Sequence, residues 1–237
     1  MEQSQLPVRE EAQERPIPWS APESWIGVVL LVLLNVGLLL FVRDAGAQLA
    51  QSAVIVFAEL AYLLPVVIIL AWKRASWAHL GFGKFNLSTM GIGCGMLVVG
   101  YSIIIVHNLI LDRLGIAPQG REIYDVLSTL DSPLWFFLAA VIVAPIVEEI
   151  FFRGFLFQGF RKRYGWMPAV LLSSLIFAAA HLDPASLIPT FILGVILAYM
   201  YHHSNSLWPG ILLHFLINGT SSLLVYLATK IPGLIPS

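Results

Sequence analysis

The sequence predicts an all-α polytopic membrane protein, a helical bundle of about seven transmembrane helices plus one amphipathic helix at the interface. Hydrophobic residues make up 58% of the 237-residue chain and charged residues only 11%, against roughly 25% charged residues in soluble domains. The mean hydropathy is +0.84. Apolar stretches of about 20 residues, enough to cross a bilayer, recur along the chain. The net charge of −1 gives no reason to expect a nucleic-acid partner.

The N-terminal segment is polar and contains proline, so we expect residues 1–24 to form a disordered cytoplasmic tail. The first span follows at Trp25–Val42. The small residues at Ala45–Ala47 resemble a signal-peptidase site, but the acidic leader and the long apolar stretch favour an uncleaved span.

Six further apolar stretches have the character of membrane spans. Pro65 interrupts the first of them, and Glu59 is its one acidic residue, which could pair with another polar group of the bundle. A short tail, residues 229–237, ends the chain. The six stretches are Ala53–Trp72, Met90–Leu111, Pro133–Phe157, Met167–His181, Ser186–Tyr201 and Trp208–Ala228.

Basic residues in the loops predict the orientation, because cytoplasmic loops carry an excess of Lys and Arg. Lys73, Arg74 and Lys84 follow the second span, and Arg161–Arg163 follows the fourth. These two loops lie on the same side of a seven-span protein. We therefore expect a multi-pass protein of a bacterial-type plasma membrane, with a cytoplasmic N-terminus.

The amphipathic helix is expected at Arg121–Leu130, between the third and fourth spans. Ile123, Val126, Leu127 and Leu130 recur there at helical spacing. Such a pattern favours a helix lying in the membrane interface.

The stretch Ala144–Gly154 places two adjacent carboxylates and a guanidinium inside the fourth span. A charge at the bilayer centre costs roughly 2.5–3.5 kcal/mol or more, so such residues mark candidate functional sites. Residues four apart share a helix face, so Glu149 should pair with Arg153, while Glu148 points about 100° away. We expect a buried ion pair and a second carboxylate free to act as a base; an interfacial or capping salt bridge is the alternative.

Two histidines lie within or at the ends of later spans. Phe177 stands four positions before His181, and Asn218 stands four positions after His214. Polar groups in lipid turn toward one another, so we expect these side chains to meet the charged residues of the fourth span. For either histidine alone, a hydrogen-bonded packing role is the alternative.

These motifs resemble those of the CAAX protease and bacteriocin-processing family. This group of intramembrane endopeptidases includes the type II CAAX prenyl proteases and the bacterial abortive-infection proteins. The resemblance covers about Leu134–Leu224 and rests on three ordered motifs. They are Glu-Glu-x-x-x-Arg at 148–153, Phe-x-x-x-His at 177–181 and His-x-x-x-Asn at 214–218.

The resemblance implies an intramembrane endopeptidase with accessory transmembrane helices at 25–131 and a protease core at 132–228. It would hydrolyse a peptide bond in a membrane-anchored or prenylated, CAAX-like protein or peptide. Glu148 would activate water as general base, while the two histidines and the asparagine would polarise the scissile carbonyl and stabilise its oxyanion. The second carboxylate and the arginine would support them. The implied site residues are Glu148, Glu149, Arg153, His181, His214 and Asn218.

Whether a metal takes part is a separate question. Glu148, His181 and His214 could hold Zn²⁺, since catalytic zinc keeps three protein ligands and one open position. However, the chain has no His-Glu-x-x-His motif. The resemblance favours a glutamate-activated water, so we expect no cofactor and keep zinc as the alternative.

Two other functions fit the same residues. Buried Glu, His and Arg could form the proton relay of a small proton-coupled carrier, or the chain could be a non-catalytic scaffold of the same fold. Bacteriocin maturation, self-immunity or cleavage of an anti-sigma-like protein would use the same motifs. The partners expected from the sequence are the lipid bilayer and a membrane-embedded or lipid-modified substrate.

Overall fold

The computed structural model describes residues 16–45, 51–116, 123–124, 127 and 133–231, and every regular element in these ranges is a helix. Six segments are long and apolar enough to cross a membrane. They correspond to six of the expected spans, so the polytopic helical bundle is confirmed. The six are Ala21–Arg43, Val54–Trp72, Ser88–Arg113, Pro133–Tyr164, Leu187–Ser204 and Leu207–Ala228.

The expected span Met167–His181 is the shorter helix α9 (Trp166–Ala180). At 1.5 Å per residue, its 15 residues cover about 22 Å, less than the ~30 Å of a bilayer core. His181 caps its C-terminal end. If α9 starts at one membrane surface, His181 therefore falls short of the other.

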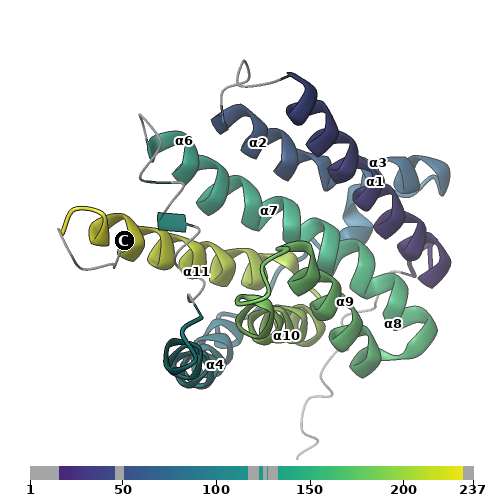
Figure 1. Ribbon diagram of the computed structural model, residues 1–237. Coiled ribbons are helices and arrows are strands. Elements are labelled where there is room, and N and C mark those ends of the chain that lie inside the picture. Colours follow the sequence, from purple (N-terminus) through teal and green to yellow (C-terminus); the bar gives the residue numbers. More distant parts are fainter. Residues whose placement is uncertain (1–15, 46–50, 117–122, 125–126, 128–132, 232–237) are drawn as a thin grey trace, which may run out of the picture.

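The fourth span runs through the middle of the bundle as one continuous rod (Figure 1). Three of its segments are α-helical and two are wound as π-helix, with hydrogen bonds to the fifth residue along. Pro145 follows the first π-helical segment and has no N–H to continue a helical ladder. The segments are α6 (Pro133–Phe137), η3 (Leu138–Val143), α7 (Ala144–Glu148), η4 (Glu149–Phe157) and α8 (Gln158–Tyr164).

The remaining helices lie on two sides of this rod (Figure 1). On one side α1 contacts α8, and α2 contacts α7 and η3. On the other side α11 contacts η3 and η4, and α10 packs between α9 and α4. Their bounds are α1 (Ala21–Ala45), α2 (Gln51–Ala61), α3 (Leu63–Trp72), α4 (Ser88–Arg113), α10 (Leu187–Ser204) and α11 (Leu207–Ala228).

The second span is broken at Tyr62, between α2 and α3. Pro65 causes the break, because its missing N–H leaves the carbonyl of Ala61 without the bond a continuous helix would supply. At the break, the Tyr62 N–H donates to the Glu59 carbonyl, three residues back rather than the four of an α-helix, at 3.1 Å. The expected interruption of this span is thus a local change of helical winding.

Part of the expected N-terminal tail packs against the rod. We call residues 16–20 the N-terminal strap; residues 1–15 lie outside the described residues. Trp19 is buried, and its indole Nε1 donates to the Phe155 carbonyl at 3.1 Å. Lys162 Nζ donates to the Ile17 carbonyl at 2.7 Å. Helix α1 begins at Ala21, four residues before the expected start of the span.

The loop before α4 is bound to the rod and to α11. This η2 loop, residues 76–83, contains η2 (Trp77–Leu80), and its Leu80 is fully buried. Gln158 Nε2 donates to the His79 carbonyl at 2.8 Å. The N–H of Leu207 donates to the Gly81 carbonyl at 2.8 Å. The accessory spans and the C-terminal half therefore share one packed interior.

The expected amphipathic helix Arg121–Leu130 lies mostly outside the described residues. Ile123, Tyr124 and Leu127 are described as helical, and Leu127 is buried. The interfacial position of this helix stays a prediction.

We expect Trp19→Phe to lower the Tm of the detergent-solubilised protein. The variant loses the buried hydrogen bond to Phe155, a loss of about 0.5–1.5 kcal/mol. Trp135→Phe is the matched control, because Trp135 is 56% exposed. Thermal unfolding followed by intrinsic fluorescence measures both; equal Tm values for the two variants would contradict a structural role of the strap.

Candidate functional site

The candidate site forms around the carboxylate of Glu149, which is fully buried where η4 begins. Its Oε1 atom accepts a hydrogen bond from Arg153 Nη1 at 2.8 Å, and the two residues form the expected ion pair. The same oxygen lies 3.1 Å from His214 Nδ1 on α11. One carboxylate oxygen thus joins η4 to α11, through two residues that are 65 positions apart in the chain.

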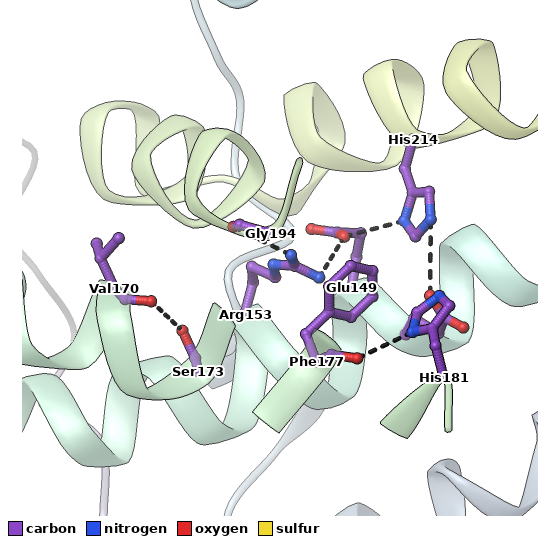
Figure 2. Close-up of polar contacts among 9 residues, drawn as sticks. Glu149, Arg153, Val170, Ser173, Phe177, His181, Gly194 and His214 are labelled. Atoms are coloured by element: carbon purple, nitrogen blue, oxygen red, sulfur yellow. Dashed lines mark hydrogen bonds and ion pairs between the residues drawn. The ribbon is translucent and has the colours of Figure 1, made fainter. Parts of the chain in front are cut away.

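Arg153 is buried, and two of its guanidinium nitrogens bond to other segments, while its Nε has no hydrogen-bond partner among the described residues (Figure 2). Its guanidinium donates through Nη2 to the Gly194 carbonyl of α10 at 3.2 Å. The guanidinium carbon also lies 4.4 Å from the centre of the Phe177 ring on α9, a cation–π distance. Arg153 therefore ties η4, α9 and α10 together while it neutralises Glu149.

Glu148 ends α7 and is 7% exposed. Its Oε2 atom lies 3.6 Å from His214 Nε2, longer than a direct hydrogen bond. Glu148 and Glu149 are adjacent in a helix and point in different directions. The imidazole of His214 has a nitrogen on each of two edges, so it contacts both carboxylates. His214 therefore bridges Glu148 and the Glu149–Arg153 ion pair.

The bonds of His214 constrain its tautomer. An ionised carboxylate only accepts hydrogen bonds, so Nδ1 carries the proton that faces Glu149. Nε2 is then the nitrogen left toward Glu148. The ring also meets Phe177 edge to face, with the ring centres 5.8 Å apart.

His181 lies beyond the last turn of α9. Its Nδ1 binds the Phe177 carbonyl at 2.9 Å, and a carbonyl only accepts, so Nδ1 carries the proton. The ring stands edge to face on Phe177, with centres 4.9 Å apart (Figure 2). His181 interacts electrostatically with His214 and Arg153. Its Nε2 is the ring nitrogen that the bond to the Phe177 carbonyl does not use.

Asn218 points toward the rod. Its Nδ2 atom donates to the Ala140 carbonyl of η3 at 2.8 Å. Ala140 belongs to the π-helical segment η3, and the Asn218 amide gives its carbonyl a hydrogen-bond partner on another helix. The structure gives Asn218 no direct contact with Glu148 or Glu149 among the described residues.

Two glycines that sequence reasoning did not single out shape the site. A Cβ atom added to Gly210 of α11 would lie 2.6 Å from Glu149 Oε2. A Cβ atom added to Gly194 would lie 3.1 Å from Phe177 Cδ1. No sequence signal separates these positions from the other glycines of the spans, because the need for space arises from a neighbouring helix.

The side chains do not fit a zinc site. Among the described residues, no three His, Cys, Asp or Glu side chains converge as metal ligands. A catalytic zinc needs three protein ligands directed at one point. We therefore derive no step through a metal.

Comparisons with known proteins match the part of the chain that holds these residues. Residues 130–220 match the family model described as type II CAAX prenyl endopeptidase Rce1-like. The chain is 25% identical over 176 residues to the "Putative membrane peptidase YdiL" of Bacillus subtilis, covering 74% of this chain and 72% of that protein.

Two further relatives are less informative. An "Uncharacterized 24.3 kDa protein" of Escherichia coli is 35% identical over 99 residues, covering 40% of this chain and 42% of that protein. The "UPF0177 protein YbdI" of Lactococcus lactis is 28% identical over 157 residues, covering 64% and 84%. No solved structure matches the chain with a significant score.

We expect Gly210→Ala to lower Tm and to displace the Glu149 carboxylate. The added methyl group would overlap Glu149 Oε2, and overpacking of this kind costs about 1–3 kcal/mol. Gly91→Ala is the matched control, because a Cβ there meets nothing within 4 Å and alanine favours helix. Its Tm should equal or exceed that of the unchanged protein. A Gly210→Ala variant as stable as Gly91→Ala would contradict the close approach.

Proposed function

Because the chain belongs to the CAAX protease and bacteriocin-processing family and is in general a CAAX-type membrane protease, we propose that Glu148 is its general base. In this proposal, Glu148 takes a proton from a water molecule, and the resulting hydroxide attacks the scissile carbonyl carbon. The carbonyl oxygen becomes an oxyanion. The contact of Glu148 with His214 carries the proposal, because it brings a buried carboxylate and an imidazole together in an apolar interior.

The two histidines would act through their Nε2 atoms. Both Nδ1 atoms are occupied, one by Glu149 and one by the Phe177 carbonyl. With Nδ1 protonated, Nε2 donates to the oxyanion when the ring is an imidazolium, which carries a proton on both nitrogens, and such donors stabilise charge developing in the transition state. Glu149 and Arg153 support this arrangement by holding His214 in one orientation.

The proposed substrate is a membrane-anchored or prenylated, CAAX-like protein or peptide. The family model and the Bacillus relative support a protein substrate in a membrane. We further propose that the protein lies in a bacterial-type plasma membrane with its N-terminus cytoplasmic, since Lys73, Arg74 and Lys84 share a loop.

We propose that the reaction proceeds without a bound cofactor. Among the described residues, no three His, Cys, Asp or Glu side chains converge as ligands, and this supports a glutamate-activated water. A chelator tests this part of the proposal independently of the residues. Activity that is lost on chelation and restored by Zn²⁺ would make His181, His214 and Glu148 metal ligands instead.

The proposal predicts that Glu148→Gln abolishes peptide cleavage. General-base catalysis contributes about 10²–10⁴-fold, so kcat should fall by that factor in a protein of unchanged Tm. The assay is cleavage of a panel of membrane-anchored and prenylated peptides by the purified protein in detergent, with and without a strong chelator. Glu23→Gln serves as control, because Glu23 pairs with Lys73 at the start of α1. Undiminished cleavage by Glu148→Gln would rule out the base.

Asn218 offers a second test, because it bonds the Ala140 carbonyl in the structure and is proposed to polarise the scissile carbonyl of the substrate. Asn218→Leu removes the amide bonded to Ala140 and should lower Tm, because losing this part-buried hydrogen bond costs about 0.5–1.5 kcal/mol of stability. If Asn218 also polarises the carbonyl, kcat should fall at least tenfold in the folded fraction, a transition-state loss of about 1.4 kcal/mol. A lower Tm with unchanged kcat would show that Asn218 has only a structural role, through its bond to the rod.

A further inference from the structure

An apolar groove with a volume of about 590 Å³ lies between α4 and α10. Ligand sites in proteins commonly have volumes of roughly 300–1,000 Å³. Only apolar residues line this groove among those that the structure describes, so it can bind hydrocarbon but offers no partner to a polar group. The lining includes Gly95, Val99 and Ile103 of α4 and Phe191, Ile192 and Val195 of α10.

Glycines of α4 set the shape of this α4–α10 groove. A Cβ atom added to Gly100 would lie 2.8 Å from Ile196 Cδ1, and one added to Gly93 would lie 3.4 Å from Met200 Sδ. The two helices are therefore antiparallel and closely packed at both points. Between them, a Cβ atom added to Gly95 would meet nothing within 4 Å, so the space beside Gly95 is open. The groove is thus a gap between two fixed contacts.

The groove is continuous with the lipid-facing surface of the bundle. Helix α4 forms one of the six spans, and most of its exposed residues are apolar. Val99, which lines the groove, is 62% exposed, and Val98 beside it is 69% exposed. An apolar surface inside a span meets the hydrocarbon of the bilayer, and an empty groove would leave its lining without dispersion contacts. An acyl chain of a bilayer lipid is therefore the occupant that this position favours.

A cation lies beside the helix end from which the groove begins. Lys84 is exposed and has no partner among the described residues. The Gly83 carbonyl before it accepts a hydrogen bond from Ser206 Oγ at 2.6 Å, which holds this segment against the start of α11. The exposed ring of Trp208 on α11 meets Phe82 edge to face, and exposed tryptophans are typical of the membrane–water interface. Lys84 therefore lies at the depth of the lipid headgroups.

We propose that the α4–α10 groove binds an anionic phospholipid of the bilayer, with one acyl chain in the groove and the phosphate at Lys84. The groove begins at Ile92, about one turn inside α4, and Lys84 lies just before that helix. A chain in the groove leaves its headgroup within reach of the ammonium group, which complements the charge of a phosphate. The bound lipid holds α4 against α10, the helix whose Gly194 carbonyl bonds Arg153, so it supports the candidate site from outside the bundle.

Gly95→Leu tests the position of the acyl chain, because the added side chain fills the open space of the groove. Gly37→Leu on α1 is the matched control, since a Cβ atom there also meets nothing within 4 Å. The purified protein in a neutral detergent is titrated with phosphatidylglycerol, and binding is followed by native mass spectrometry and by the rise in Tm. We expect Gly95→Leu to weaken binding about tenfold relative to Gly37→Leu, with equal Tm for the two variants before lipid is added.

Lys84→Gln tests the position of the headgroup and leaves the groove intact, so it remains informative if Gly95→Leu does not fold. We expect it to weaken phosphatidylglycerol binding about fivefold, the contribution of one cation near an anionic lipid, and to leave the weaker binding of phosphatidylcholine unchanged. Arg113→Gln is the matched control, because Arg113 is exposed at the opposite end of α4. That variant should bind phosphatidylglycerol as the unchanged protein does.

Three results would overturn the proposal. Equal phosphatidylglycerol affinities of Gly95→Leu and Gly37→Leu would remove the groove as a lipid site. A Gly95→Leu variant that turns a dimer into a monomer while it still binds lipid would show that a second copy of the chain covers the groove. Equal affinities of the unchanged protein for the two lipids, or of Lys84→Gln and Arg113→Gln for phosphatidylglycerol, would remove the headgroup from Lys84.

Discussion

The buried charge of Glu149 is the interaction on which the surrounding structure depends. Leaving one member of a buried ion pair without its partner costs about 3–5 kcal/mol, so the arginine cannot be separated from the carboxylate. The partners are fixed in turn. Arg153 lies over Phe177 and donates to Gly194, while His214 approaches from α11. Satisfying one carboxylate thus sets the relative positions of four helical segments.

This dependence extends beyond the segment that matches the family model, residues 130–220. The N-terminal strap and the η2 loop both bind the backbone or side chains of the rod. The Gln158 amide donates to the Gly154 carbonyl at 2.6 Å as well as to His79 in the loop. A Cβ atom on Gly154 would lie 3.0 Å from the Leu80 carbonyl. The accessory spans therefore pack into the same interior that supports the site.

Much of the architecture follows from local sequence. Six of the seven predicted spans are helices long enough to cross a membrane, because about 20 consecutive apolar residues cross a bilayer whatever surrounds them. The Glu149–Arg153 pair was predicted because helical geometry fixes positions four apart. The convergence of His214 on these charges follows from the need of polar groups in lipid to find partners. These features can be predicted from the helical repeat and from the apolar character of the lipid alone.

Other features depend on residues far apart in the chain and gave no readable signal. Trp19 is buried because it meets Phe155, 136 positions later, so a polar segment that looks like a tail contains a packed residue. The amide of Asn218 donates to the Ala140 carbonyl in a π-helical segment. No periodic pattern of residues in the sequence marks such a segment. The space beside Gly210 is set by a carboxylate on another helix.

The position of His214 on α11 has a consequence for biosynthesis. Chains are made from the N-terminus at about 5–20 residues per second, so α11 is the last of the described helices to be made. Before it joins the bundle, Glu149 has Arg153 alone, Glu148 has no imidazole beside it, and the Gly81 carbonyl awaits the N–H of Leu207. A nascent or incompletely inserted copy therefore holds the ion pair without His214, and the candidate site is complete only when translation of the spans is finished.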